Sequence, residues 1–327
     1  MNSVADHPLR SALFNKDRQG CFDIVSSDLI GQSLVDVIYE MLFFCASVKY
    51  VGELILHPLC VINSIKNFIG DERENPSKSL MIFGVDYLLE FELRDSDHNS
   101  IEEVTKNGLE ETVFVGELED ACQNSDWQNA KSIMSKTFLA SDRSRATLDT
   151  LSELALQNSP TNVIFVYHLL RSYQFQEKKN DNWTFINCIF EQIKFRGLEP
   201  AHSPTKVTPE TIKDKVINSG DIVYYSAIKN IWDGDYVRSR GFRRELSYWL
   251  SKIDLEQTIK DKQGPRYLLT HKVEKSFTAY AKEIINNDSK TKNKKAKELV
   301  TLEAVRSMLK TICLLYTSDA ADDTDSV

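Results

Sequence analysis

Residues 125–175 read SDWQNAKSIMSKTFLASDRSRATLDTLSELALQNSPTNVIFVYHLLRSYQF, and this stretch decides the fold class. The tetrapeptide Ser125-Asp126-Trp127-Gln128 has the spacing of a helix-capping box, and apolar residues follow it at every third or fourth position. A second apolar run spans 148–155, and Pro160 opens a third. The pattern predicts three helices joined by tight turns, which is typical of helical hairpins.

The rest of the chain continues this pattern and offers few turn residues. Its 327 residues include only 12 glycines and 8 prolines, whereas a β-sandwich or barrel needs frequent turns. We therefore predict an all-α protein, built as an irregular bundle or an array of helical hairpins. One of its helices is expected to run from Ser100 to Leu118. Further helices are expected at 209–217, 221–232, 236–253, 266–286 and 295–312.

Three prolines between 200 and 209 mark a loop at 198–208, which we take as the boundary between two regions. A main helical domain is expected over 1–198. A smaller helical region is expected over 209–312, packed on the main domain or extending it. Within this second region, Asn286 to Lys297 has few apolar residues and many lysines, so we expect a polar linker there.

The composition limits where the protein is expected to be located and which class of partner it is expected to bind. No run approaches the ~20 apolar residues that a membrane span needs, and the N-terminus lacks the pattern of a secretory signal. A soluble, cytoplasmic protein is therefore expected. The six cysteines are far apart in sequence and indicate buried free thiols rather than disulfides or a zinc site. The net charge of −8 argues against a nucleic-acid or anionic-membrane partner.

The last segment, 313–327, is set aside from the functional argument. Residues 313–323, which read CLLYTSDAADD, resemble a sequencing-library adapter that has been translated. On this interpretation the natural chain continues differently after residue 312, and the helix over 295–312 is cut short.

Two histidines are the candidate catalytic residues. His57 lies between apolar residues at the start of a helix, and His168 lies inside a helix that is apolar nearly all round. If they met in a pocket, they could form an acid–base pair or half of a metal site. The alternative is that each is a core residue bonded to a nearby polar group. The common dinucleotide, P-loop, zinc-protease, serine-hydrolase and EF-hand motifs are absent, and the sequence identifies no cofactor.

Two short segments carry a family resemblance. Leu56-His57-Pro58-Leu59 and the segment 165–170, FVYHLL, resemble histidine-bearing helices of the questin oxidase family. In place of the further histidines of that family, residues 60–63 read CVIN. The resemblance implies an all-helical oxidoreductase that oxygenates an apolar or aromatic small molecule without an obvious bound flavin, with His57 and His168 in the pocket.

Two polar patterns have a functional and a structural interpretation. Asp86 and Glu90 lie one helical turn apart and could bind a cation or form a solvated face. The segment 233–244 carries four arginines that could hold a phosphate, although Arg240 and Arg244 are expected to form a solvated stripe.

Two hypotheses for the function follow. The first is a helical scaffold that binds a protein or peptide, since this needs no catalytic motif. The second is the questin oxidase-like oxidoreductase with His57 and His168 in an enclosed pocket.

Overall fold

A computed structural model describes residues 7–50, 52, 56–95, 99–108, 114–176, 178–219, 221–253 and 265–322. In these ranges the chain forms sixteen α-helices and one short 3₁₀ helix, and it contains no strand. A single isolated bridge joins Val48 to Leu93. The prediction of an all-α protein is confirmed.

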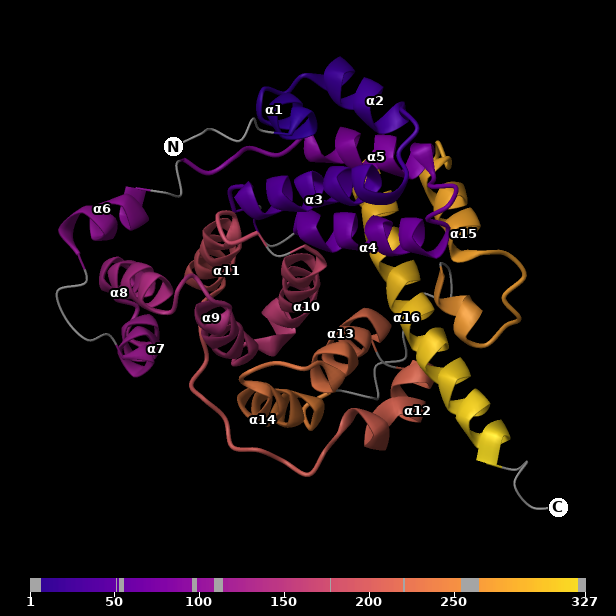
Figure 1. The fold of residues 1–327 in the computed structure, drawn as a ribbon. Helices are drawn as coiled ribbons and strands as arrows, with labels where there is room; N and C mark the ends of the chain where they lie inside the picture. Colours follow the sequence, from indigo (N-terminus) through magenta and orange to yellow (C-terminus); the bar gives the residue numbers. More distant parts are fainter. Residues whose placement is uncertain are drawn as a thin grey trace.

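The first five helices form one layer, with α1 and α2 lying over α3, α4 and α5 (Figure 1). They span Pro8–Phe14 (α1), Arg18–Ser26 (α2), Gly31–Ser47 (α3), Pro58–Asp71 (α4) and Lys78–Leu88 (α5). Helix α4 buries apolar residues and also Asn63, Ser64 and Lys66. Ser64 donates to the carbonyl of Cys60 within α4, whereas the amide nitrogen of Asn63 bonds His168 of another helix.

Of the next six helices, α9, α10 and α11 lie near the middle of the view, and α6, α7 and α8 lie at its left edge (Figure 1). They span Asn99–Asn107 (α6), Val115–Gln123 (α7), Trp127–Ala140 (α8), Ala146–Leu156 (α9), Ser159–Phe175 (α10) and Asn182–Arg196 (α11). The single helix expected from Ser100 to Leu118 is wrong. Helix α6 is followed by Gly108 in the left-handed region (φ 80°), and a separate α7 begins at Val115.

The remaining helices follow the loop 198–208 and pack onto the first two groups. They span Pro209–Ser219 (α12), Ile222–Asp233 (α13), Ser239–Leu250 (α14), the 3₁₀ helix Pro265–Leu269 (η1), Phe277–Ile285 (α15) and Lys292–Asp322 (α16). Helix α13 packs against α10, and α16 packs against both α13 and α4. Figure 1 shows α16 passing from the first layer along one side of the molecule.

Two expectations for this second region are corrected. The helix predicted over 266–286 is divided into η1 and α15, with non-helical backbone at 270–276. The polar linker is shorter than expected because α16 already begins at Lys292. Helix α16 continues to Asp322, into the segment that resembles an adapter, and the side chains after residue 310 lie outside the described part. The interpretation of that segment stays a prediction.

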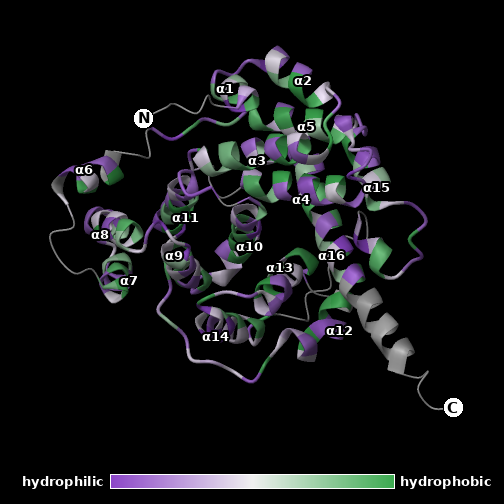
Figure 2. Ribbon diagram, in the orientation of Figure 1, coloured by the Kyte–Doolittle hydropathy of each residue, from purple (hydrophilic) through white to green (hydrophobic). Residues whose placement is uncertain are grey.

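Side-chain caps fix where several helices start. The carboxylate of Asp17 accepts from the backbone N–H of Gly20, and that of Asp221 accepts from Val223 and Tyr224. Figure 2 shows apolar and polar residues alternating along most helices, as expected where one face is buried and the other meets water. The packed faces enclose one apolar core that extends from Leu9 in α1 to Met308 in α16.

The described cysteines are all buried and free, as the sequence indicated. Within the described part of the chain, no helix combines the length and the apolar character needed to cross a membrane.

The contact between α14 and α9 gives a test of close packing. A Cβ atom at Gly241 would overlap the carboxyl group of Glu153, which Arg238 and Arg244 hold in place. We expect Gly241→Ala to lower the free energy of unfolding by about 1–3 kcal/mol, measured by urea titration.

The matched control is Gly70→Ala, because a Cβ atom there meets open space in α4. This change should leave stability unchanged or raise it by about 0.5–1 kcal/mol, since alanine favours a helix over glycine. Equal effects at the two positions would contradict the packing argument.

Candidate functional site

The imidazole of His57 caps a helix. Its Nδ1 accepts a hydrogen bond from the backbone N–H of Leu59 at 3.2 Å, at the start of α4. The sequence His-Pro-Leu also occurs at 7–9, where His7 caps α1 with the same bond at 3.2 Å. Of these two caps, that of His57 is the more deeply buried, with Nε2 3.7 Å from the sulfur of Cys188. The His-Pro-Leu sequence is therefore a local helix-start signal in this chain.

The imidazole of His168 is bonded across the interface between α10 and α4. Its Nδ1 lies 2.8 Å from Nδ2 of Asn63, and both side chains are buried. His57 reaches the same interface, where its ring meets that of Phe165 edge-on at 4.8 Å between centroids. The structure thus brings both histidines to the contact of α4 with α10 and gives each one its own protein partners.

Burial keeps both imidazoles neutral. It lowers the pKa of His57 to about 3, assisted by the positive charges of Arg94 and Arg196. It likewise lowers the pKa of His168 to about 3, assisted by the charge of Lys66. Neutral rings that are packed and hydrogen-bonded can hold helices in register, whereas a general acid or base at neutral pH needs a pKa near 7.

The other polar patterns from the sequence are occupied by ion pairs. The ammonium nitrogen of Lys292 lies 2.6 Å from a carboxylate oxygen of Asp86 and 2.5 Å from one of Glu90. This ammonium group therefore occupies the site that the sequence suggested for a cation. Arg244 does not belong to a solvated stripe, because its guanidinium bonds Glu153 in α9 at 2.9 Å. Among the described residues, no group of three histidine, cysteine or acidic side chains could hold a metal ion.

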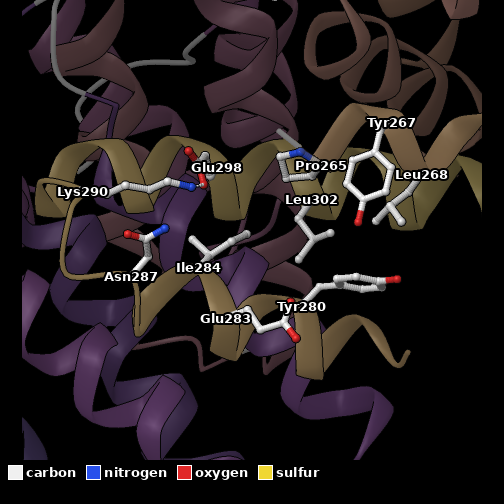
Figure 3. A pocket seen from close by; sticks show the side chains of 10 residues that line it. All are labelled: Pro265, Tyr267, Leu268, Tyr280, Glu283, Ile284, Asn287, Lys290, Glu298 and Leu302. Carbon is white, nitrogen blue, oxygen red and sulfur yellow. Dashed lines mark hydrogen bonds and ion pairs between the residues drawn. The ribbon is translucent and has the colours of Figure 1, made fainter. Parts of the chain in front are cut away.

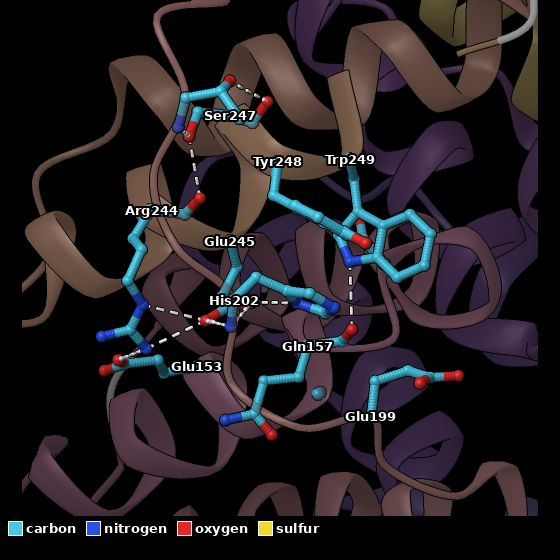
Figure 4. Close-up of polar contacts among 12 residues, drawn as sticks. Glu153, Gln157, Glu199, His202, Arg244, Glu245, Ser247, Tyr248 and Trp249 are labelled. Atoms are coloured by element: carbon cyan, nitrogen blue, oxygen red, sulfur yellow. Dashed lines mark hydrogen bonds and ion pairs between the residues drawn. The ribbon is translucent and has the colours of Figure 1, made fainter. Parts of the chain in front are cut away.

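The loop 198–208 is fixed to α14 by a contact between a histidine and a carboxylate (Figure 4). Nδ1 of His202 lies 2.7 Å from Oε2 of Glu245, a carboxylate with no exposed surface. The ring of His202 stacks on that of Tyr248, with 3.8 Å between centroids. Trp249 donates from Nε1 to the backbone carbonyl of Gln157, the residue after α9, at 3.0 Å. The first two contacts fix the loop to α14, and the third joins α14 to the end of α9.

A pocket of about 250 Å³ lies where η1, α15 and α16 meet (Figure 3). Tyr267 and Tyr280 stand at one end, and the pair formed by Lys290 and Glu298, 2.6 Å apart, stands at the other. Aliphatic side chains line the space between these ends. The complete lining is Pro265, Tyr267, Leu268, Tyr280, Glu283, Ile284, Asn287, Lys290, Glu298 and Leu302.

Each of the three walls of the pocket is hydrogen-bonded to another helix. In α15, Oγ1 of Thr278 donates to the backbone carbonyl of Phe68 in α4 at 2.9 Å. In η1, Arg266 donates to the carbonyl of Ile217 in α12 at 2.8 Å. In α16, Glu303 accepts from Asn67 of α4 at 2.6 Å, one residue after the lining residue Leu302. Two walls are bonded to α4 and the third to α12, so these contacts hold the pocket in shape without a ligand.

Sequence reasoning missed this pocket. It treated 266–286 as one continuous helix. In such a helix Tyr267 and Tyr280 would follow one another along the same element and would not face a common cavity. A usable signal was the mostly polar run 270–276, which ends at Ser276, the cap of α15.

Comparison with known proteins supplies no relative. A scan against protein-family models, a search of curated proteins and a search of solved structures each gave no match. The function is therefore inferred from the geometry of the chain itself.

The two buried histidines predict a sensitivity to acid. Below pH 6.5 the unfolded chain binds a proton on each imidazole, whereas the folded chain does not until about pH 3. Stability should therefore fall as the pH drops through this window, by roughly 1.4 kcal/mol per pH unit for each histidine. Urea titrations at pH 6.5 and pH 5 would show a loss of about 3 kcal/mol from the pair, since each unfolded imidazole is already half protonated at pH 6.5.

The comparison that isolates this effect uses the double variant His57→Asn/His168→Gln, in which asparagine retains a capping acceptor. Its stability should depend less steeply on pH, whereas the exposed-ring variant His271→Gln should keep the wild-type dependence. The same pH dependence in the double variant and the wild type would show that the histidines are not the cause.

Proposed function

We propose that the chain is a helical scaffold whose η1–α15–α16 pocket binds a segment of a protein or peptide partner. The observation that carries the proposal is the pocket itself, about 250 Å³ in volume, with an apolar middle and polar groups at both ends. Cofactors and drug-sized molecules occupy roughly 300–1,000 Å³, so this volume suits a single large side chain. A partner would insert one residue and hold it between the tyrosines and the lysine–glutamate pair.

The exposure of one lining residue supports binding from outside the molecule. Tyr267 keeps 44% of its surface exposed, so the aromatic end of the pocket opens to solvent. Partly exposed tyrosines are frequent at protein interfaces, because the ring supplies apolar area and the hydroxyl supplies a hydrogen bond.

The oxidoreductase hypothesis has less support from the geometry. It needs an enclosed cavity lined by both His57 and His168, whereas both rings are bonded to protein groups in the contact of α4, α10 and α11. The lining of the pocket described above includes neither residue.

Selection from a displayed library of random peptides would test the scaffold proposal. We expect the immobilised chain to enrich a set of peptides, and Tyr280→Ala to weaken their binding by at least about tenfold, since a buried aromatic contact is a typical hot spot. Binding would be measured by fluorescence anisotropy of labelled peptides.

The matched control is Phe195→Ala, which removes another aromatic ring, 53% exposed, from a surface in α11. It should leave peptide binding unchanged. Failure to enrich any peptide, or equal loss in both variants, would contradict the assignment of the pocket as the binding site.

A further inference from the structure

The aromatic end of the pocket already holds a cation that belongs to the chain. Nζ of Lys275 lies 2.5 Å from Oε1 of Glu283 and 5.9 Å from the centre of the Tyr280 ring. Tyr267, from η1, stands at the same end of the pocket as Tyr280. One electron-rich ring and one carboxylate thus lie beside a single positive charge, and a second tyrosine stands nearby.

This arrangement is the one that proteins use for ammonium groups. The face of a tyrosine ring attracts a cation placed within about 6 Å of its centre, and a carboxylate beside it accepts the ammonium hydrogens. The neighbouring apolar wall, which includes Ile284 and Leu302, suits the methylene chain that carries such a group.

Lys275 itself is held only loosely. Its side chain is 52% exposed and that of Glu283 is 55% exposed, so water competes for both charges. Ion pairs of this kind contribute little to stability, and an external ammonium group can replace the internal one at small cost. Lys275 precedes the cap of α15 and lies in the non-helical segment 270–276, so its departure breaks no helix.

We propose that the pocket recognises a lysine side chain of a basic peptide segment in the partner, and that this side chain takes the place of Lys275 between Glu283 and the two tyrosines. The inference rests on the proposed function of the pocket and names the residue type that enters it. The hydroxyl end of the pocket then binds the ammonium group, and the aliphatic middle binds the methylene chain.

The first experiment uses n-butylammonium chloride, which is the lysine side chain without its backbone, and 1-butanol as a neutral analogue of the same length. Binding is followed through the ring-proton chemical shifts of Tyr267 and Tyr280 at constant ionic strength. We expect n-butylammonium to bind the Lys275→Gln variant about three- to fivefold more tightly than the wild type, because the internal competitor is gone. We expect 1-butanol to bind both chains equally and more weakly.

Two further variants control the result. Glu283→Gln, made in the Lys275→Gln background, should abolish the preference for the amine over the alcohol. Lys272→Gln removes an equal charge from an exposed position three residues away and should leave the affinity at the wild-type value. Thermal melts followed by circular dichroism would show that all variants are folded.

The outcomes separate this inference from the proposed function. Equal binding of amine and alcohol, or equal affinity in wild type and Lys275→Gln, would overturn recognition of a cation while the peptide selection still decides whether the pocket binds a partner. Absence of binding by n-butylammonium to Lys275→Gln would also overturn it. Enrichment of lysine among the selected peptides would support it, and peptides that bind at Tyr280 without a basic residue would contradict it.

Discussion

Helix α4 buries polar groups that neighbouring helices bond, and these bonds help to fix the arrangement of those helices. Five helices pack against it: α3, α5, α10, α15 and α16. They supply His168 for Asn63 and Glu303 for Asn67, and a backbone carbonyl of α4 accepts the hydroxyl of Thr278. Since an unpaired buried polar group is costly, these bonds select one placement of the neighbours among the many that apolar packing alone would allow.

The fold could be predicted from sequence where the signal was local. His57-Pro58 opens α4 and Gly197 follows the end of α11, because a cap or a left-handed residue acts within one turn of the chain. The break at Gly108 was missed because apolar residues on both sides of it keep a helical period. The pairing of Asp86 with Lys292 joins residues 206 positions apart, and no local pattern reports such a contact.

The candidate site shows that sequence alone identifies chemically unusual residues but not the residues that form a pocket. His57 and His168 are conspicuous in sequence because a lone imidazole among apolar residues is rare, yet their surroundings explain them as a cap and an interhelical bond. Tyr267 and Tyr280 attract no notice in sequence, because single aromatic residues in a helical pattern normally belong to a core. Their role depends on the turn between η1 and α15, which brings two rings to one cavity. Chemical type alone therefore identified unusual residues, whereas the placement of ordinary residues formed the pocket.

The position of α16 against α4 has a consequence for synthesis on the ribosome. Arg306 and Lys310 both bind Asp71, and the first of these contacts spans 235 residues. Until that part of the chain has left the exit tunnel, Lys66, Asn67 and Asp71 face a gap on one side of a helix whose other sides are already covered. Until then the nascent chain exposes an incomplete apolar core. Partly folded intermediates of this kind are the ones that chaperones bind. Helix α16, which is made late, thus completes the layer that is made first.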